Sequence, residues 1–165
     1  MQTHPLFSND STASQTNWLM VSDQVMGGKS QGSIQMTEAG VTMQGQVSLE
    51  NNGGFLQIQW PISNSVPASD LQNYRGVFIE WCAQQNETLE LLLKSTQLWM
   101  PWQSYRYKAN VTTQWQTIYV PFEAFEPFRT RTALKPQRIT KFAVLAGGKA
   151  ISVNVTIRKF GLYSD

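Results

Sequence analysis

The sequence predicts an all-β domain, built as a sandwich or a barrel of antiparallel strands. Three observations lead to this prediction. About nine or ten short segments alternate apolar and polar residues, which is the period of a β-strand. No long segment carries the period of a helix. The 7 prolines and 11 glycines fall mostly between the alternating segments, where turns are needed.

The expected strands, in chain order, cover residues 18–21, 33–36, 41–48, 56–60, 77–82, 89–94, 102–109, 115–120, 139–146 and 151–157. Residues 33–48 are expected to form a half-buried hairpin that turns at 38–40, because two alternating runs flank a polar turn ending in glycine. The strands at 77–82 and 89–94 are expected to be adjacent core strands, since only a short polar link joins them.

Outside the strands, the sequence predicts little regular structure. Residues 1–17 are polar and aperiodic, which predicts an N-terminal arm before a single domain at 18–165. A chain of 165 residues is long enough for one domain of ordinary size. Single helical turns are expected at 68–73 and at 121–125, where proline opens the turn and its missing N–H costs least.

Charge and cysteine content exclude several classes of protein. A net charge of +2 is too small for a nucleic-acid binder. The only cysteine is Cys82 and the only histidine is His4, which excludes an internal disulfide and a zinc site built from these residues. No run reaches the roughly 18 apolar residues of a membrane span, and MQTHPLFSND lacks the regions of a signal peptide. We therefore expect a cytoplasmic protein without a membrane span.

Two glycine pairs stand out, in residues 22–30 (SDQVMGGKS) and 50–55 (ENNGGF). We call these segments the first and second glycine turns. A glycine pair usually marks positive φ or a close approach of another segment. The first turn is not a phosphate-binding loop, because Asp23 stands where that motif needs a glycine and a strand follows Lys29. An anion-binding nest is one alternative, but a tight turn where two segments cross is favoured.

Asp23 and Glu50 would lie close together if the two turns meet. We favour a structural role in which each caps nearby backbone N–H groups. One alternative is a shared calcium ion, which would need about six to eight oxygens with Asn51 and Asn52 contributing. Another is a carboxylate pair for glycoside hydrolysis, formed by these two acids or by Glu80 and Glu90, and the spacing favours neither pair. The sequence shows no arrangement of a nucleophilic side chain with a neighbouring general base. The expectation is therefore no catalytic residue, no metal and no cofactor.

Aromatic and basic residues suggest two further surfaces. Trp99 and Trp102 flank Met100 and Pro101 in an expected loop. Core filling is the ordinary role of tryptophan, but exposed rings could stack on sugars or anchor a protein partner. Residues 129–141 contain five cationic side chains and no acid. Such a segment is usually a solvated loop, and the alternative is docking onto an acidic partner, which salt would weaken.

The order of these pieces resembles that of a known family. A tryptophan, the first glycine turn, an alternating strand, the second glycine turn, YRGV at 74–77, Trp115, VPFEAF and an amphipathic C-terminal strand follow one another. Over about residues 18–163 the chain resembles the complex I intermediate-associated protein family. The resemblance implies a jelly-roll β-sandwich of the galactose-binding-like type, a fold that carbohydrate-binding modules also use. It also implies a non-catalytic role in assembling respiratory NADH:ubiquinone oxidoreductase.

These observations lead to three hypotheses about the function. The first is an assembly-factor or chaperone-like domain that binds a protein, such as a respiratory complex subunit or assembly intermediate. The alternative is a carbohydrate-binding module that uses exposed aromatic rings, and the third is an enzyme acting through the two acids. The candidate residues for binding a ligand or partner are Asp23, Met26, Gly27, Gly28, Ser30, Glu50, Asn51, Asn52, Gly53, Gly54, Trp99 and Trp102.

Overall fold

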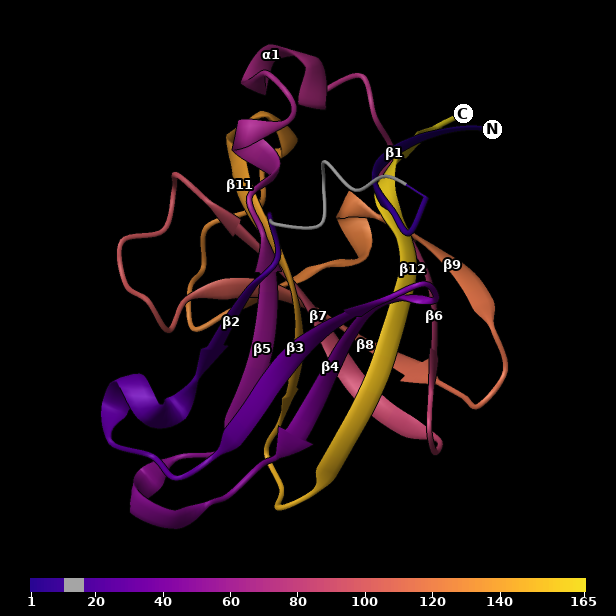
Figure 1. Ribbon diagram of the computed structural model, residues 1–165. Coiled ribbons are helices and arrows are strands. Elements are labelled where there is room, and N and C mark those ends of the chain that lie inside the picture. The colour runs from indigo at the N-terminus through magenta and orange to yellow at the C-terminus, as the bar shows by residue number, and fades with distance from the viewer. Residues whose placement is uncertain (11–16) are drawn as a thin grey trace.

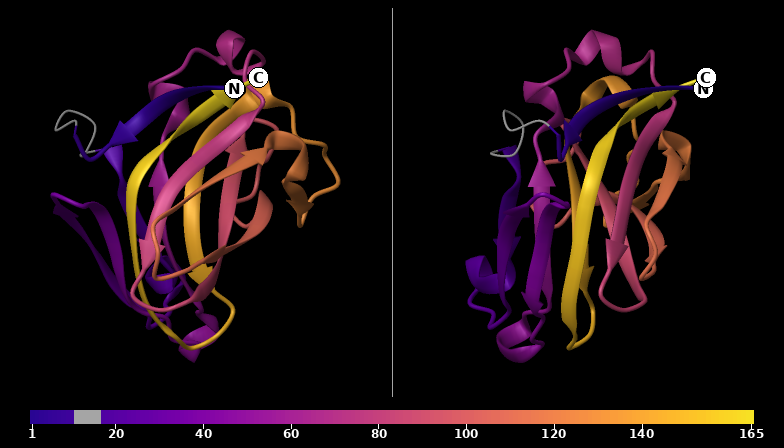
Figure 2. Two further views of the ribbon diagram at one scale, coloured as in Figure 1. Left: turned by 90° about the vertical axis from the view of Figure 1, so that its right-hand side faces the viewer. Right: turned by 45° about the vertical axis from the view of Figure 1, so that its right-hand side comes forward.

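The computed structural model describes residues 1–10 and 17–165, which form two antiparallel six-stranded sheets packed face to face (Figures 1 and 2). Sheet A contains β1 (Gln2–Ser8), β3 (Gln31–Thr37), β4 (Gly40–Gln46), β6 (Gly76–Ala83), β9 (Gln116–Pro121) and β12 (Ser152–Ser164). Sheet B contains β2 (Leu19–Ser22), β5 (Phe55–Trp60), β7 (Glu87–Ser95), β8 (Ser104–Val111), β10 (Glu126–Phe128) and β11 (Ile139–Gly147). The short helical turns are η2 (Asp23–Met26), η3 (Glu50–Asn52), η4 (Ile62–Asn64), α1 (Ala68–Leu71), η5 (Phe122–Ala124) and η6 (Pro136–Arg138). None of these described helices is both long and apolar enough to cross a membrane.

The long C-terminal strand β12 holds sheet A together. Its first half pairs with β4 and its second half with β1 along one edge, while β6 pairs along the other edge. Alternate residues Val153, Val155 and Ile157 are buried, because the period of two points them all into the sandwich. The pairing of β1 with β12 places the two chain termini side by side at one end (Figure 1).

Sheet B is organised around β11, which lies between β5 and β7. The full order across the sheet is β10-β8-β7-β11-β5-β2, so chain neighbours are often not sheet neighbours. The two sheets meet over a core rich in aromatic side chains. Trp18 and Trp60 pack edge to face with ring centroids 5.1 Å apart, and Phe142 stacks on Phe160 at 4.2 Å. All four rings are buried.

The all-β prediction is confirmed, and the expected strands match the observed ones closely. The hairpin of β3 and β4 turns at residues 38–39, with Thr37 opposite Gly40. The expected helical turns appear as α1 and η5.

Two expectations are wrong. Residues 2–8 of the expected arm form β1, because Phe7 supplies an apolar anchor that is 1% exposed; residues 11–16 of that arm lie outside the described residues. The strands β6 and β7 are not adjacent, since β6 belongs to sheet A and β7 to sheet B. Both carry an inward apolar face, and alternation alone does not say which sheet a strand joins.

Candidate functional site

The two glycine turns meet through one buried carboxylate. Asp23 is fully buried at the start of η2, and Ser22 caps that turn by accepting a hydrogen bond from the Gln24 backbone N–H. The Asp23 carboxylate accepts the backbone N–H and the hydroxyl of Ser30 within its own turn. It also accepts the backbone N–H groups of Gly54 and Phe55 from the second turn. The turns therefore lie together, at the end of the sandwich opposite α1 and the termini (Figures 1 and 2).

In each glycine pair, one glycine adopts a positive φ and the other packs against the Asp23 carboxylate. Gly27 and Gly54 adopt φ of 83° and 143°, which side-chain-bearing residues rarely adopt. Gly28 and Gly53 instead border the Asp23 carboxylate. A Cβ at Gly28 would overlap the Cγ and Oδ1 atoms of Asp23, and a Cβ at Gly53 would lie 2.6 Å from its Oδ2. The pairs are thus explained as a structural device in which two backbones close around one carboxylate.

Asp23 links the pH to the stability of the fold. Burial opposes its ionisation, but the hydrogen bonds from Ser30, Gly54 and Phe55 outweigh burial and bring the pKa of Asp23 below its ordinary value of 3.8. A folded-state pKa below the unfolded one stabilises the protein above about pH 4, and this contribution is lost as the pH falls through the folded pKa. We expect the unfolding free energy to fall between pH 5 and 3 by more in the wild type than in D23N, measured by urea denaturation. Equal pH dependence of the two proteins would contradict this assignment.

Glu50 does not share the role expected for it. Its side chain is exposed, and its carboxylate makes no hydrogen bond or ion pair within the described part of the chain. Asn51 instead makes the second link between the turns, because its side-chain amide donates to the Gly27 carbonyl oxygen at 3.2 Å. Residues 1–10 and 17–165 contain no group of three His, Cys, Asp or Glu side chains placed to hold a metal ion. The oxygens of Asp23 are occupied by protein donors, so Asp23 and Glu50 do not form a carboxylate pair open to a ligand.

A groove of about 1010 Å³ lies on the outer face of sheet B, and we call it the sheet B groove. Its floor is apolar, because it is lined by Phe55 and by Leu92 and Leu145, which belong to a small buried cluster with Ala143. Gln57 and Ser95 are buried polar residues that also line it, and the buried Oε1 atom of Gln57 has no hydrogen-bond partner within the described structure. The groove therefore has a mainly apolar floor.

The rim of the groove is formed by two segments that sequence reasoning had singled out separately. Val25 and Met26 project from the first glycine turn, and they are 75% and 61% exposed. Trp99 and Trp102, 89% and 56% exposed, project from the loop between β7 and β8. The ordinary expectation that these two tryptophans fill the core is therefore wrong. Large apolar side chains gathered around one groove are typical of a binding surface.

The tryptophan loop is fastened by polar contacts. The Gln103 side-chain oxygen accepts the backbone N–H groups of Trp99 and Met100, each at 3.2 Å. The ammonium of Lys94 donates to the carbonyl oxygens of Pro101 and Gln103. A loop whose backbone is fixed in this way loses little backbone entropy on binding, so the loop backbone is pre-organised.

Sequence reasoning found the rim but missed the floor. The candidates Met26, Trp99 and Trp102 come together at the groove, whereas Ser30, Gly28 and Gly53 surround Asp23 beneath the turns. A signal for the floor was present in LELLLKS, because three consecutive leucines predict a strand with both faces covered. Leu91 and Leu93 point into the core, and Leu92 points into the groove.

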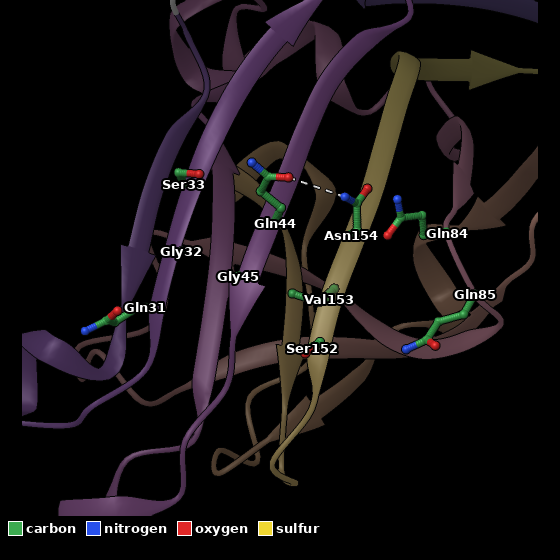
Figure 3. A pocket seen from close by; sticks show the side chains of 10 residues that line it. All are labelled: Gln31, Gly32, Ser33, Gln44, Gly45, Gln84, Gln85, Ser152, Val153 and Asn154. Carbon is green, nitrogen blue, oxygen red and sulfur yellow. Dashed lines mark hydrogen bonds between the residues drawn. The ribbon is translucent and has the colours of Figure 1, made fainter.

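A second hollow, of about 610 Å³, lies on the outer face of sheet A and is lined by neutral polar side chains (Figure 3). Gln44 and Asn154 lie on neighbouring strands, and the Asn154 amide donates to Gln44 Oε1 at 3.3 Å. Ser152 likewise donates to Gln46. These amides and hydroxyls satisfy one another across the strands, and this hollow lacks the apolar floor of the sheet B groove.

Two antiparallel sheets packed face to face place the chain in the fold class of the jelly-roll β-sandwich of the galactose-binding-like type. Solved structures bear this out. The family 11 carbohydrate-binding module of a cellulosomal cellulase of Clostridium thermocellum has a TM-score of 0.74 at 15% identity, over 99% of this chain and 95% of that chain. The same type of module in complex with a β-1,3-1,4-mixed-linked tetrasaccharide has a TM-score of 0.69 at 15% identity, over 90% and 89%. An agarase matches at a TM-score of 0.69 and 12% identity over the whole of this chain, which covers 25% of that enzyme.

The sequence identifies the family more narrowly than the fold does. The model of the complex I intermediate-associated protein 30 family matches residues 6–154, which is most of the chain. The chain belongs to this family. A comparison with curated proteins gave no significant match.

Proposed function

We propose that the chain is a non-catalytic assembly-factor domain with a chaperone-like role, and that it binds a subunit or assembly intermediate of respiratory complex I in the sheet B groove. Membership of the family supports the assembly role. A cytoplasmic location is part of the proposal, and fractionation of the source cells tests it.

One observation carries the choice of the groove. Five of the eleven exposed large hydrophobic side chains in the described structure line this one surface, namely Val25, Met26, Trp99, Met100 and Trp102. Tryptophan is enriched among the residues that dominate protein interfaces, and methionine adapts its shape to different apolar partners. Burying such a surface against a client removes apolar area from water, which contributes about 25 cal/mol for each Å².

The double variant W99A/W102A is expected to lose the client, because it removes both aromatic anchors from the rim. The measurement is affinity purification of the tagged protein from its source cells, with complex I subunits quantified by mass spectrometry. We expect recovery to fall at least tenfold, which corresponds to about 1.4 kcal/mol. The matched control is W115A, which removes a tryptophan that is 38% exposed, lies just before β9 and does not line the groove. Recovery of no complex I subunit by the wild type would contradict the proposal.

Carbohydrate binding in the same groove is the second candidate function. It is favoured by two exposed tryptophans beside the polar side chains of Gln57 and Gln59, and by the likeness to carbohydrate-binding modules. Titration with a β-1,3-1,4-mixed-linked tetrasaccharide, followed by tryptophan fluorescence, tests this function. Saturable binding that W99A weakens and W115A preserves would favour it over the assembly role. A titration without any change in tryptophan fluorescence would exclude carbohydrate binding of this kind.

A further inference from the structure

The sheet B groove carries an unbalanced positive charge. Lys94 on β7 and Lys141 on β11 are direct partners across the two strands, and both line the groove. Like charges placed directly opposite each other destabilise a sheet. Neither lysine forms an ion pair with an acid in the described structure. An arrangement that costs stability and faces a groove points to a ligand that offsets the charge.

The other charged residues at the groove do not offset this charge. Arg106 on β8 and Arg129 after β10 also line the groove, and none of the groove-lining residues is acidic. Glu90, which lies on β7 with Lys94, is paired with Arg106 at 2.8 Å. The field of Lys94 and Lys141 is therefore left without a counter-charge.

Lys94 retains the capacity to bind an anion while it fastens the tryptophan loop. Its ammonium has three N–H donors, and two of them serve the carbonyl oxygens of Pro101 and Gln103. Burial, together with the charges of Arg106 and Lys141, lowers the pKa of Lys94 to about 8. The group is thus charged at neutral pH and loses its charge in mild alkali.

We infer that the sheet B groove binds an acidic segment of the client protein, with a carboxylate of that segment seated at Lys94 and Lys141 and its apolar side chains against the rim. This inference rests on the proposed function and names the chemistry of the client. Met26, Met100 and Val25 favour a peptide over an acidic oligosaccharide, because aliphatic and thioether side chains suit apolar peptide side chains.

The test uses the whole chain and a short peptide that carries several Glu and Leu residues, compared with the same peptide carrying Gln in place of Glu. We expect the Glu peptide to bind at least tenfold more tightly, and its binding to weaken as salt rises. The variant K94Q/K141Q should bind the Glu peptide about tenfold more weakly. The control K135Q/K149Q removes the same charge from exposed positions outside the groove and should bind as the wild type does.

A pH series adds a second readout. Binding of the Glu peptide should weaken as the pH rises through about 8, because Lys94, which shares the groove with Arg106, Arg129 and Lys141, loses its proton there. The K94Q variant should lack this step, and so should the Gln peptide.

Several outcomes separate this inference from the proposed function. Equal binding of the two peptides, or equal loss in K94Q/K141Q and K135Q/K149Q, overturns the inference. Binding of oligogalacturonate without binding of either peptide overturns it in favour of an acidic sugar. A third outcome is that K94Q/K141Q recovers as much of the complex I subunits as the wild type, while W99A/W102A recovers much less. The groove would then bind its client without using the two lysine charges, which overturns the inference and leaves the proposed function standing. The proposed function fails separately, when the wild type itself recovers no complex I subunit.

Discussion

Replacing Asp23 with alanine is expected to lower the free energy of unfolding by roughly 3–5 kcal/mol. The carboxylate is fully buried and accepts hydrogen bonds from Ser30, Gly54 and Phe55, and the variant leaves these donors without partners. Each buried donor left unsatisfied costs about 1–3 kcal/mol. D23N should also be strongly destabilised, because either orientation of its amide places an NH2 group against a backbone N–H donor.

Urea denaturation at neutral pH measures this effect. The matched control is D70A, which removes an exposed aspartate from α1 and should change stability by less than about 0.5 kcal/mol. If D23A were as stable as D70A, the carboxylate would not be what holds the two glycine turns together.

Replacing Gly28 with valine is expected to destabilise the fold by about 3 kcal/mol or more, while Gly27→Ala should cost only about 1–2 kcal/mol. The new Cβ at position 28 would overlap the Asp23 carboxylate, which has no space to move without breaking its hydrogen bonds. Position 27 has φ of 83°, but a Cβ added there would meet no atom within 4 Å, so the substitution carries only the conformational cost.

Thermal unfolding of G28V, G28A and G27A provides the measurement. The expected order of melting temperatures is wild type, G27A, G28A and then G28V. A G28V protein that melts with the wild type would contradict the structural account of the first turn, and binding would then be its remaining role. These variants also report on the groove, because Val25 and Met26 belong to the same turn and form part of its rim.

Most of the sandwich could be predicted from the sequence because its strands follow the period of two. The runs that form β4, β5, β7 and β12 alternate apolar and polar residues, and their apolar positions Val41, Ile58, Leu91 and Val155 are buried in the core. The β1 strand was missed because Phe7 is the only fully buried residue in it, and one anchor leaves no period to detect. The assignment of β6 and β7 to different sheets depends on how the link between them crosses the sandwich, which local pattern does not encode.

The individual residues of the candidate site could be predicted from the sequence, but their arrangement in space could not. The sequence predicts that Asp23 and the glycine pairs form a structural contact, because short acidic side chains commonly accept hydrogen bonds from the backbone N–H groups of turns. Glu50 is also an acid in a glycine turn, yet its side chain is exposed. Which of the two acids lies between the turns depends on the path of the folded backbone, which the sequence pattern does not give. The pairing of Lys94 with Lys141 could not be predicted, because it depends on the register between β7 and β11.

The central claim is that the client protein lies in the sheet B groove, and site-specific photo-crosslinking in the source cells tests it most directly. A photoreactive amino acid replaces Met100 at the groove rim in one protein and Met36 on β3 in a second. The groove position should crosslink to a complex I subunit through an acidic segment, and the β3 position should not. A complex I crosslink from Met36 together with none from Met100 would contradict the claim.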